Sequence, residues 1–256
     1  MNVRFLGSAS SVPNVGNDCP CFLVNNKYLV DCGYSVLTAL RNNNCDISKI
    51  EYIIFTHMHH DHYIGLAGLL FFMLQSKQKK ISELTVLGPE NMPEVMEKTY
   101  AFLQLDQFFS DAGRPKLVPL KEGDVFETED AIFKAGSCYH PVPARCYRME
   151  SKVDNKILAF TGDTAYKADM AELFKNADAI IHDCTLGPSI MTDDPRTRGC
   201  GHSSLNEAIK LCENADIPIL FPMHMNDEDC IYSINKFQAT TKTKLIFPEQ
   251  SEDFIL

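Results

Sequence analysis

The sequence predicts a mixed α/β fold in which helices cover β-sheets, and three observations lead to this class. Short apolar runs rich in β-forming residues alternate with segments of helical periodicity along the chain. The strands in series outnumber those of a simple βαβ repeat. No stretch of disordered composition divides the 256 residues, so we expect one domain over residues 1–256.

The first half of the chain carries five predicted strands, at residues 3–7, 21–24, 28–33, 51–57 and 84–89. The Asn-Asn-Lys segment at 25–27 is typical of a hairpin turn between two of them. Segments with helical patterns follow at 63–76 and 91–109. The apolar run 63–74 is too short to span a bilayer, so it predicts a buried helix.

The second half continues the alternation, with strands predicted at 116–120, 124–127, 131–140, 144–150, 156–163, 177–184, 217–224 and 244–247. Residues 151–155 predict a short hairpin, and residues 186–201 a long polar loop. Helices are expected at 166–176, 204–215 and 229–238. Ser204 and Glu207 fit a capping box at the start of the second of these helices.

The formal net charge of −10 argues against a broad basic surface for nucleic acid, although a bound metal can supply local positive charge. The first residues lack the apolar run of a signal peptide, which favours a cytoplasmic protein that does not enter the membrane. Ten cysteines are then expected as reduced thiols. Cys19, Cys21 and Cys32 lie close in sequence; buried free thiols are favoured over a small structural metal site there.

Five of the predicted strands, at 51–57, 131–140, 156–163, 178–183 and 217–224, end on a histidine or aspartate: His57, His140, Asp163, Asp183 and His224. Strand ends can converge at one edge of a sheet, where functional sites are commonly built. One polar residue after a strand is unremarkable in a folded protein. Five together predict a site at this edge.

Four of the eight histidines lie within residues 57–62, which read His-x-His-x-Asp-His. In an extended segment His57 and His59 point the same way, so they can bind one metal ion as a pair. Asp61 and His62 follow where the chain turns into a helix and face a second point. Imidazole nitrogen and carboxylate oxygen are common zinc ligands, so the run predicts an open catalytic metal site. His60 is interpreted as non-ligating.

The His-x-His-x-Asp-His run after a buried strand, with Gly-Asp-Thr at 162–164 and later histidines, resembles the metallo-β-lactamase superfamily. Within it, the chain is similar to the ribonuclease Z and phosphodiesterase branch, through the motifs at 3–13, 30–33, 140–148, 161–164, 180–185 and 201–208. The resemblance covers essentially the whole chain. It implies a four-layer αββα sandwich, the metallo-β-lactamase fold.

The resemblance also implies the ligands of two divalent metal ions. His57, His59 and His140 would hold one ion. Asp61, His62 and His224 would hold the second. Asp163 would bridge the two. Zinc is the first candidate, although such sites also take manganese or iron.

The resemblance implies catalytic roles as well. His202 matches the histidine of the family's His-Ser-Thr motif, here His-Ser-Ser, and would donate a proton. Asp183 stands where the family has a glutamate, so a shorter carboxylate would have to reach His202. Asp61 would orient or deprotonate the nucleophile. Two metal ions lower the pKa of a shared water, and the metal-bridged hydroxide attacks phosphorus or a carbonyl carbon.

The expected activity is that of a metal-dependent hydrolase, a phosphodiesterase acting on a small-molecule or short-nucleotide substrate. The ribonuclease Z resemblance implies a long arm that grips transfer RNA before the Gly-Asp-Thr motif. Only 23 positions separate His140 from Asp163, so this arm is expected to be absent and transfer RNA is disfavoured. Ribonuclease Z activity, or a lactone, ester or β-lactam hydrolase, stays an alternative. The chain could also form a homodimer.

Overall fold

The computed structural model describes all residues except 78, 189–198, 226–237 and 249–251. Its described strands form two seven-stranded sheets. The first sheet has the order β14-β1-β2-β3-β4-β5-β6, and its strands are β1 Asn2–Gly7, β2 Cys21–Val24, β3 Tyr28–Val30, β4 Tyr52–Ile54, β5 Thr85–Gly88, β6 Lys116–Pro119 and β14 Asp253–Ile255. The second has the order β13-β12-β11-β10-β9-β8-β7, and its strands are β7 Val125–Glu127, β8 Ala131–Ser137, β9 Arg145–Ser151, β10 Ile157–Phe160, β11 Ala179–Asp183, β12 Ile219–Met223 and β13 Lys244–Leu245.

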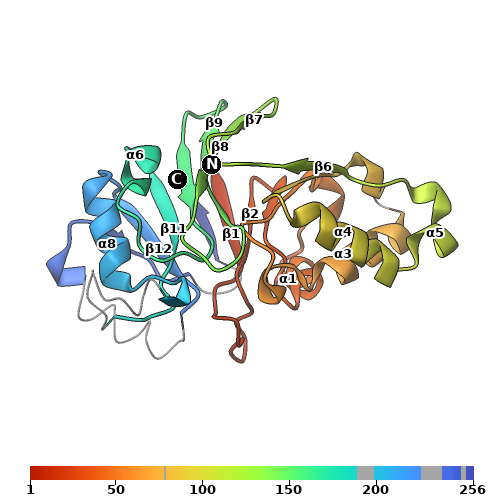
Figure 1. Ribbon diagram of the computed structural model, residues 1–256, viewed down its shortest axis with the longest axis horizontal. Coiled ribbons are helices and arrows are strands. Elements are labelled where there is room, and N and C mark those ends of the chain that lie inside the picture. The colour runs from red at the N-terminus through yellow and green to blue at the C-terminus, as the bar shows by residue number, and fades with distance from the viewer. Residues whose placement is uncertain (78, 189–198, 226–237, 249–251) are drawn as a thin grey trace.

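Helices cover the outer face of each sheet, which confirms the predicted four-layer αββα sandwich (Figure 1). On the first sheet lie α1 Val36–Asn42, α3 Leu66–Ser76 and α4 Met92–Phe102, followed by α5 Leu105–Phe108. On the second lie α6 Met170–Phe174 and α8 Leu205–Asn214. The short α2 His60–Tyr63 carries part of the histidine cluster. Short 3₁₀ turns occupy Ile47–Lys49, Ile81–Glu83, Ser110–Ala112 and Gln238–Thr240.

Aromatic side chains fill the space between the two sheets. The ring of Phe160 from β10 lies 5.5 Å from that of Phe22 in β2 and 5.2 Å from that of Tyr147 in β9. Phe5 and Phe221 meet in the same layer at 5.2 Å. These rings are buried. Since each aromatic ring removes a large apolar area from water, this layer holds the two sheets face to face.

Parallel pairing brings several strand ends to one edge. In the first sheet β3, β4, β5 and β6 run parallel to one another; in the second β10, β11, β12 and β13 do. The two edges are joined where Arg145 N donates to the carbonyl of Thr56 at 2.8 Å. The carboxyl ends of strands in both sheets therefore open on one rim of the sandwich, as the strand-end pattern predicted.

Several predicted boundaries were wrong for local reasons. The helix predicted at 91–109 breaks into α4 and α5 because Gln104 takes a left-handed backbone conformation, with φ +50°. The strand predicted at 28–33 ends at Val30 because Asp31 has φ +56°. The helix predicted at 166–176 is confined to α6. Strand β14 was not predicted; it pairs with β1 in the register Val3 to Phe254.

The capping box predicted for the helix at 204–215 is confirmed in α8. The Ser204 side chain accepts from Glu207 N, and the Glu207 carboxylate accepts from Ser204 N at 2.9 Å. The helix predicted at 229–238 lies almost wholly outside the described residues. Within the described part of the chain, no helix is long and apolar enough to cross a membrane.

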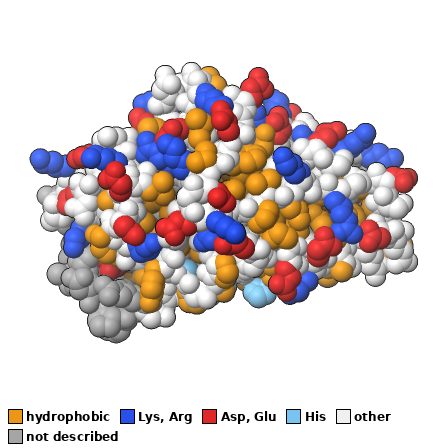
Figure 2. Space-filling model, turned by 45° about the horizontal axis from the view of Figure 1, so that its top comes forward, with side chains coloured by type: hydrophobic (Ala, Val, Ile, Leu, Met, Phe, Trp, Pro, Cys, Tyr) orange, Lys and Arg blue, Asp and Glu red, His pale blue; other side chains and the backbone are white. Residues whose placement is uncertain are grey.

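The surface carries charges of both signs. On the face shown in Figure 2, lysine and arginine side chains are interspersed with aspartate and glutamate, and hydrophobic side chains lie between them. This face offers no broad basic area, as expected from the net charge of −10.

Replacing Phe160 by alanine should lower the free energy of unfolding by about 3–5 kcal/mol, because it leaves a cavity between the sheets. Phe102→Ala is the matched control: Phe102 is 78% exposed, so its loss should change stability by about 0.5 kcal/mol or less. Urea denaturation of both variants measures the difference. Equal losses would contradict the assignment of the aromatic layer as the main core.

Candidate metal centre

The predicted ligands come together on the rim formed by the strand ends. Among the described residues, three groups of side chains have their ligand atoms within 4.8 Å of one another, and two of them hold the predicted ligands: His57, His59, His140 and Asp163 in the first, and Asp61, His62, Asp163 and His224 in the second. The third group, Asp183, His202 and His224, overlaps the second. Asp163 is common to the first two groups. These are the two sets of side chains that the family resemblance implied as ligands, and the structure brings the members of each set together.

In the first group three imidazole nitrogens converge. His57 Nε2 lies 3.1 Å from His59 Nδ1, which lies 3.0 Å from His140 Nε2. Zinc–nitrogen bonds of about 2.0–2.1 Å in a tetrahedral site place two nitrogens about 3.3 Å apart. The spacing of the three nitrogens therefore fits a single ion.

In the second group His62 supplies an observation that tests the fit. Its Nε2 is buried and makes no hydrogen bond, although Asp61 Oδ2 lies 3.3 Å and Asp163 Oδ1 3.4 Å away. His224 Nε2 lies 3.2 Å from the same Asp61 oxygen. A buried polar atom without a partner is costly, whereas a cation among these nitrogen and oxygen atoms would satisfy it. The donor set therefore fits a metal ion.

The outer nitrogens of the ligand rings are held by hydrogen bonds. His62 Nδ1 donates to Asp31 Oδ2 at 2.8 Å, and His140 Nδ1 donates to the carbonyl of Gly201 at 2.8 Å. Such partners fix the orientation of a metal-binding imidazole and the nitrogen that carries its proton. Asp31 lies within the motif at 30–33, but sequence reasoning did not predict it as a site residue. Its position just after an apolar strand was the available signal.

Gly162, just before the shared carboxylate, is required by both conformation and space. Its φ is +58°, and a Cβ there would lie 2.4 Å from Thr56 Oγ1. Only glycine lets the chain after β10 pass this close to the segment before His57. This close approach brings Asp163 between the two histidine groups.

Burial and charge set the ionisation of the ligands. Burial lowers the pKa of His57, His59 and His140, which keeps these rings neutral and able to donate a lone pair. Burial opposes ionisation of Asp163, but the charges of His224 and His62 hold the pKa of that carboxyl well below its usual range. The first group therefore presents neutral imidazoles to the ionised Asp163, whereas nearby carboxylates outweigh burial and raise the pKa of His62 and His224.

His202 lies beside the ligands, with its ring centroid 5.4 Å from those of His140 and His224. Asp183 Oδ2 accepts from its Nδ1 at 2.9 Å, so the shorter carboxylate does reach this histidine. Burial lowers the pKa of His202, but the hydrogen bond and charge of Asp183 outweigh burial and raise it to about 9. His202 can therefore carry a proton at neutral pH.

Other residues considered from the sequence lie apart from the two groups. His60 is exposed and packs against the ring of Tyr63, in agreement with a non-ligating residue. Cys19, Cys21 and Cys32 are buried free thiols and belong to none of the metal-binding groups among the described residues. The arginines in the loop 186–201, at 196 and 198, lie outside the described residues.

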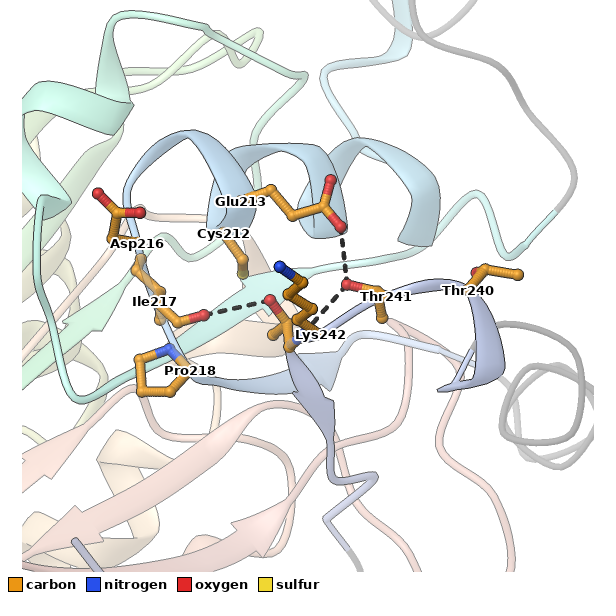
Figure 3. A pocket seen from close by; sticks show the side chains of 9 residues that line it. Cys212, Glu213, Asp216, Ile217, Pro218, Thr240, Thr241 and Lys242 are labelled. Atoms are coloured by element: carbon orange, nitrogen blue, oxygen red, sulfur yellow. Dashed lines mark hydrogen bonds between the residues drawn. The ribbon is translucent and has the colours of Figure 1, made fainter.

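Cavity size does not locate this site. A cavity of only about 20 Å³ lies among Asp31, His62, Asp163 and His224. A wider one, of about 750 Å³, lies before the start of β12, at the end of that strand opposite His224 (Figure 3). Its polar groups bond one another, as Thr241 and Glu213 do at 2.9 Å. The converging ligand atoms and the unpartnered Nε2 of His62, and not the wider cavity, mark the candidate site.

Comparison with known proteins agrees with the fold. Ribonuclease BN of Enterobacter sp. (strain 638) is 25% identical over 313 residues, which cover 100% of this chain and 99% of that protein. The metallo-β-lactamase fold protein YhfI from Bacillus subtilis matches with a TM-score of 0.79 at 18% identity, over 99% of this chain and 98% of that one. The short form of human tRNase Z matches with a TM-score of 0.77 at 20% identity, over 100% and 99%.

These likenesses confirm the predicted metallo-β-lactamase superfamily and its ribonuclease Z-like branch, and with them a metal-dependent hydrolase. A family model described as Anti-Pycsar protein Apyc1 matches residues 1–247. The match spans almost the whole chain, and the chain therefore belongs to the Anti-Pycsar protein Apyc1 family.

Proposed function

We propose that this chain is a dinuclear metal-dependent phosphodiesterase that acts on a small or short phosphodiester. The observation that carries the proposal is the Asp183–His202 pair beside the two ligand groups, with Nδ1 of His202 2.9 Å from the carboxylate. A proton donor next to a metal centre is what cleavage of a phosphodiester requires, because the departing alkoxide must be protonated.

The ligands proposed for two ions are His57, His59 and His140 for one, Asp61, His62 and His224 for the other, and Asp163 for both. Zinc is the first candidate, because nitrogen and carboxylate ligands suit it, and manganese or iron are alternatives. When bound, two such ions supply hydroxide near neutral pH and neutralise charge on the phosphate oxygens. Asp61 would orient the nucleophile from its position between His62 and His224.

His202 would deliver the proton from Nε2. Its Nδ1–H is engaged by Asp183, which leaves the other ring nitrogen to face the substrate. The same carboxylate stabilises the imidazolium before transfer. His202 therefore acts on the leaving oxygen, while the ligand groups act on the phosphate.

The features that favour a small substrate lie away from the centre. The chain between β9 and β10 is a tight hairpin, from Ser151 to Ile157, where a transfer-RNA-gripping arm would have to be inserted. The alignment with ribonuclease BN spans 313 residues against 256 here, so that relative carries insertions that this chain lacks. Transfer RNA binding depends on basic contacts to phosphates, and the net charge here is −10.

Ribonuclease Z activity is the second candidate, favoured by the name and full-length coverage of the ribonuclease BN relative. A lactone, ester or β-lactam hydrolase on the same scaffold is the third. The three differ in the bond that is cleaved or in substrate size, so activity measurements separate them.

The purified protein should hydrolyse bis(p-nitrophenyl) phosphate, and chelation of its metal should abolish this turnover. His202→Ala should lower kcat by about 10²- to 10⁴-fold, because the proton donor is lost, while metal content measured by elemental analysis stays unchanged. His60→Ala is the matched control and should retain activity. Turnover of a lactone or a chromogenic β-lactam without phosphodiester turnover would refute the proposal.

Substrate size can be tested with a panel that runs from a cyclic mononucleotide through a dinucleotide to a precursor transfer RNA. We expect kcat/KM to be highest for the small members, because no arm or basic surface is available to hold the RNA. Cleavage of the precursor at its 3′ end with a higher kcat/KM than any small member would instead establish the ribonuclease.

Asp183→Asn should lower the pKa of His202 from its value of about 9, because burial is then no longer outweighed by the hydrogen bond and charge of Asp183. NMR titration of metal-free protein with labelled histidine measures this shift. In the wild type the raised pKa adds stability that is complete below about pH 6.5 and is lost as the pH rises through about 9. An unchanged pKa in the variant would show that Asp183 does not support His202.

A further inference from the structure

We propose that the hydroxyl of Thr185 is a positioning group that fixes the ring of His224 and connects it to the carboxylate that also holds His202. Thr185 Oγ1 lies 2.7 Å from His224 Nδ1 and 2.6 Å from Asp183 Oδ1. The inference rests on the proposed role of His224 as a metal ligand.

The directions of these hydrogen bonds follow from the chemistry of the three groups. An ionised carboxylate can only accept, so the single hydroxyl proton of Thr185 is donated to Asp183. The hydroxyl oxygen must then accept from Nδ1–H of His224. This places the ring proton on Nδ1 and leaves the lone pair of Nε2 facing Asp61, 3.2 Å away, among the ligands of the second group.

The Asp183 carboxylate is fixed by four hydrogen bonds and its side chain is fully buried. Oδ1 accepts from Thr185 N at 2.8 Å and from its hydroxyl at 2.6 Å. Oδ2 accepts from Thr164 N at 3.0 Å and from His202 at 2.9 Å. One carboxylate therefore supports the proton donor with one oxygen and, through Thr185, a metal ligand with the other.

The backbone of His224 is strained, so both its backbone and its ring need contacts that hold them in place. Its φ of +63° lies in the left-handed region, which costs a non-glycine residue on the order of 1 kcal/mol. His224 N donates to the carbonyl of Ser8 at 2.9 Å, which holds the backbone. Among the described residues, Thr185 supplies the hydrogen bond to Nδ1, and so it determines how the ring is turned.

A second buried carboxylate beside the ligand groups, Asp31, has the same arrangement. Thr56 Oγ1 donates to Asp31 Oδ2 at 2.8 Å and lies 3.2 Å from His57 Nδ1, from which it can accept. Asp31 also accepts directly from a histidine, His62, at 2.8 Å. Each carboxylate thus supports one histidine directly and a second through a threonine hydroxyl. The repeat of this pattern at two carboxylates argues against an incidental contact of Thr185.

The test compares Thr185→Val, which keeps the shape and removes the hydroxyl, with Thr185→Ser, which keeps the hydroxyl. Zinc affinities are measured by competition with a chelator, and anomalous diffraction assigns each ion to its ligand group. Thr185→Val should weaken the ion beside His224 by about 10- to 100-fold and leave the ion beside His57 unchanged. Thr185→Ser should bind both ions as the wild type does.

Two matched variants sharpen the comparison. Thr56→Val should weaken the ion beside His57 and spare the ion beside His224. Thr243→Val removes a buried hydroxyl that donates to the carbonyl of Ile217 at 3.2 Å, at the end of β12 opposite His224, and should leave both affinities unchanged. If Thr185→Val does not fold, Thr185→Ala removes the hydroxyl with less steric demand.

The outcomes separate this inference from the proposed function. If the wild type binds two ions and Thr185→Val binds both equally well, Thr185 has no positioning role, while the two-metal centre stands. Equal loss of both ions in Thr185→Val would indicate general unfolding of the site and would also overturn the inference. If the wild type binds no zinc at these residues, the proposed function itself fails.

Discussion

The metal centre depends on one buried carboxylate, Asp163, which lies between two groups of imidazoles. In each group the ligand nitrogen and oxygen atoms lie within 4.8 Å of one another, and His62 Nε2 has no hydrogen-bond partner. Such a cluster is unfavourable by itself, because buried polar atoms without partners lose their hydration. A cation bound among these atoms would account for their geometry. Hydrogen bonds from neighbouring residues hold the ligand rings in place around it.

The fold determines where the ligand side chains lie, and hydrogen bonds from neighbouring groups determine how their rings are oriented. Parallel strands in two facing sheets deliver His57, Asp163 and His224 to one rim, and the aromatic layer keeps the sheets together. Orientation comes from a second set of contacts: Asp31, Thr185 and the carbonyl of Gly201 each hold one ligand ring. The strained backbone of His224 and the close approach at Gly162 are local costs that the core must offset.

Sequence reasoning predicted what is local or periodic and missed what depends on distant contacts. Polar residues after apolar strands singled out His140, Asp163 and Asp183, while the division of the ligands into two groups came from the family resemblance; the structure brings the side chains of each group together. Strand β14 was missed because it is short and pairs with β1 across almost the whole chain. Thr185 was missed because its role depends on its contact with His224, which lies far along the chain, and a threonine after a strand has no distinguishing signal.

The central claim is that two ions share Asp163. The most direct measurement is anomalous diffraction at the zinc edge from crystals of the wild-type protein grown with zinc. We expect two anomalous-difference peaks about 3.5–4 Å apart. One should lie beside His57, His59 and His140, and the other beside Asp61, His62 and His224. A single peak, or none within reach of Asp163, would contradict it.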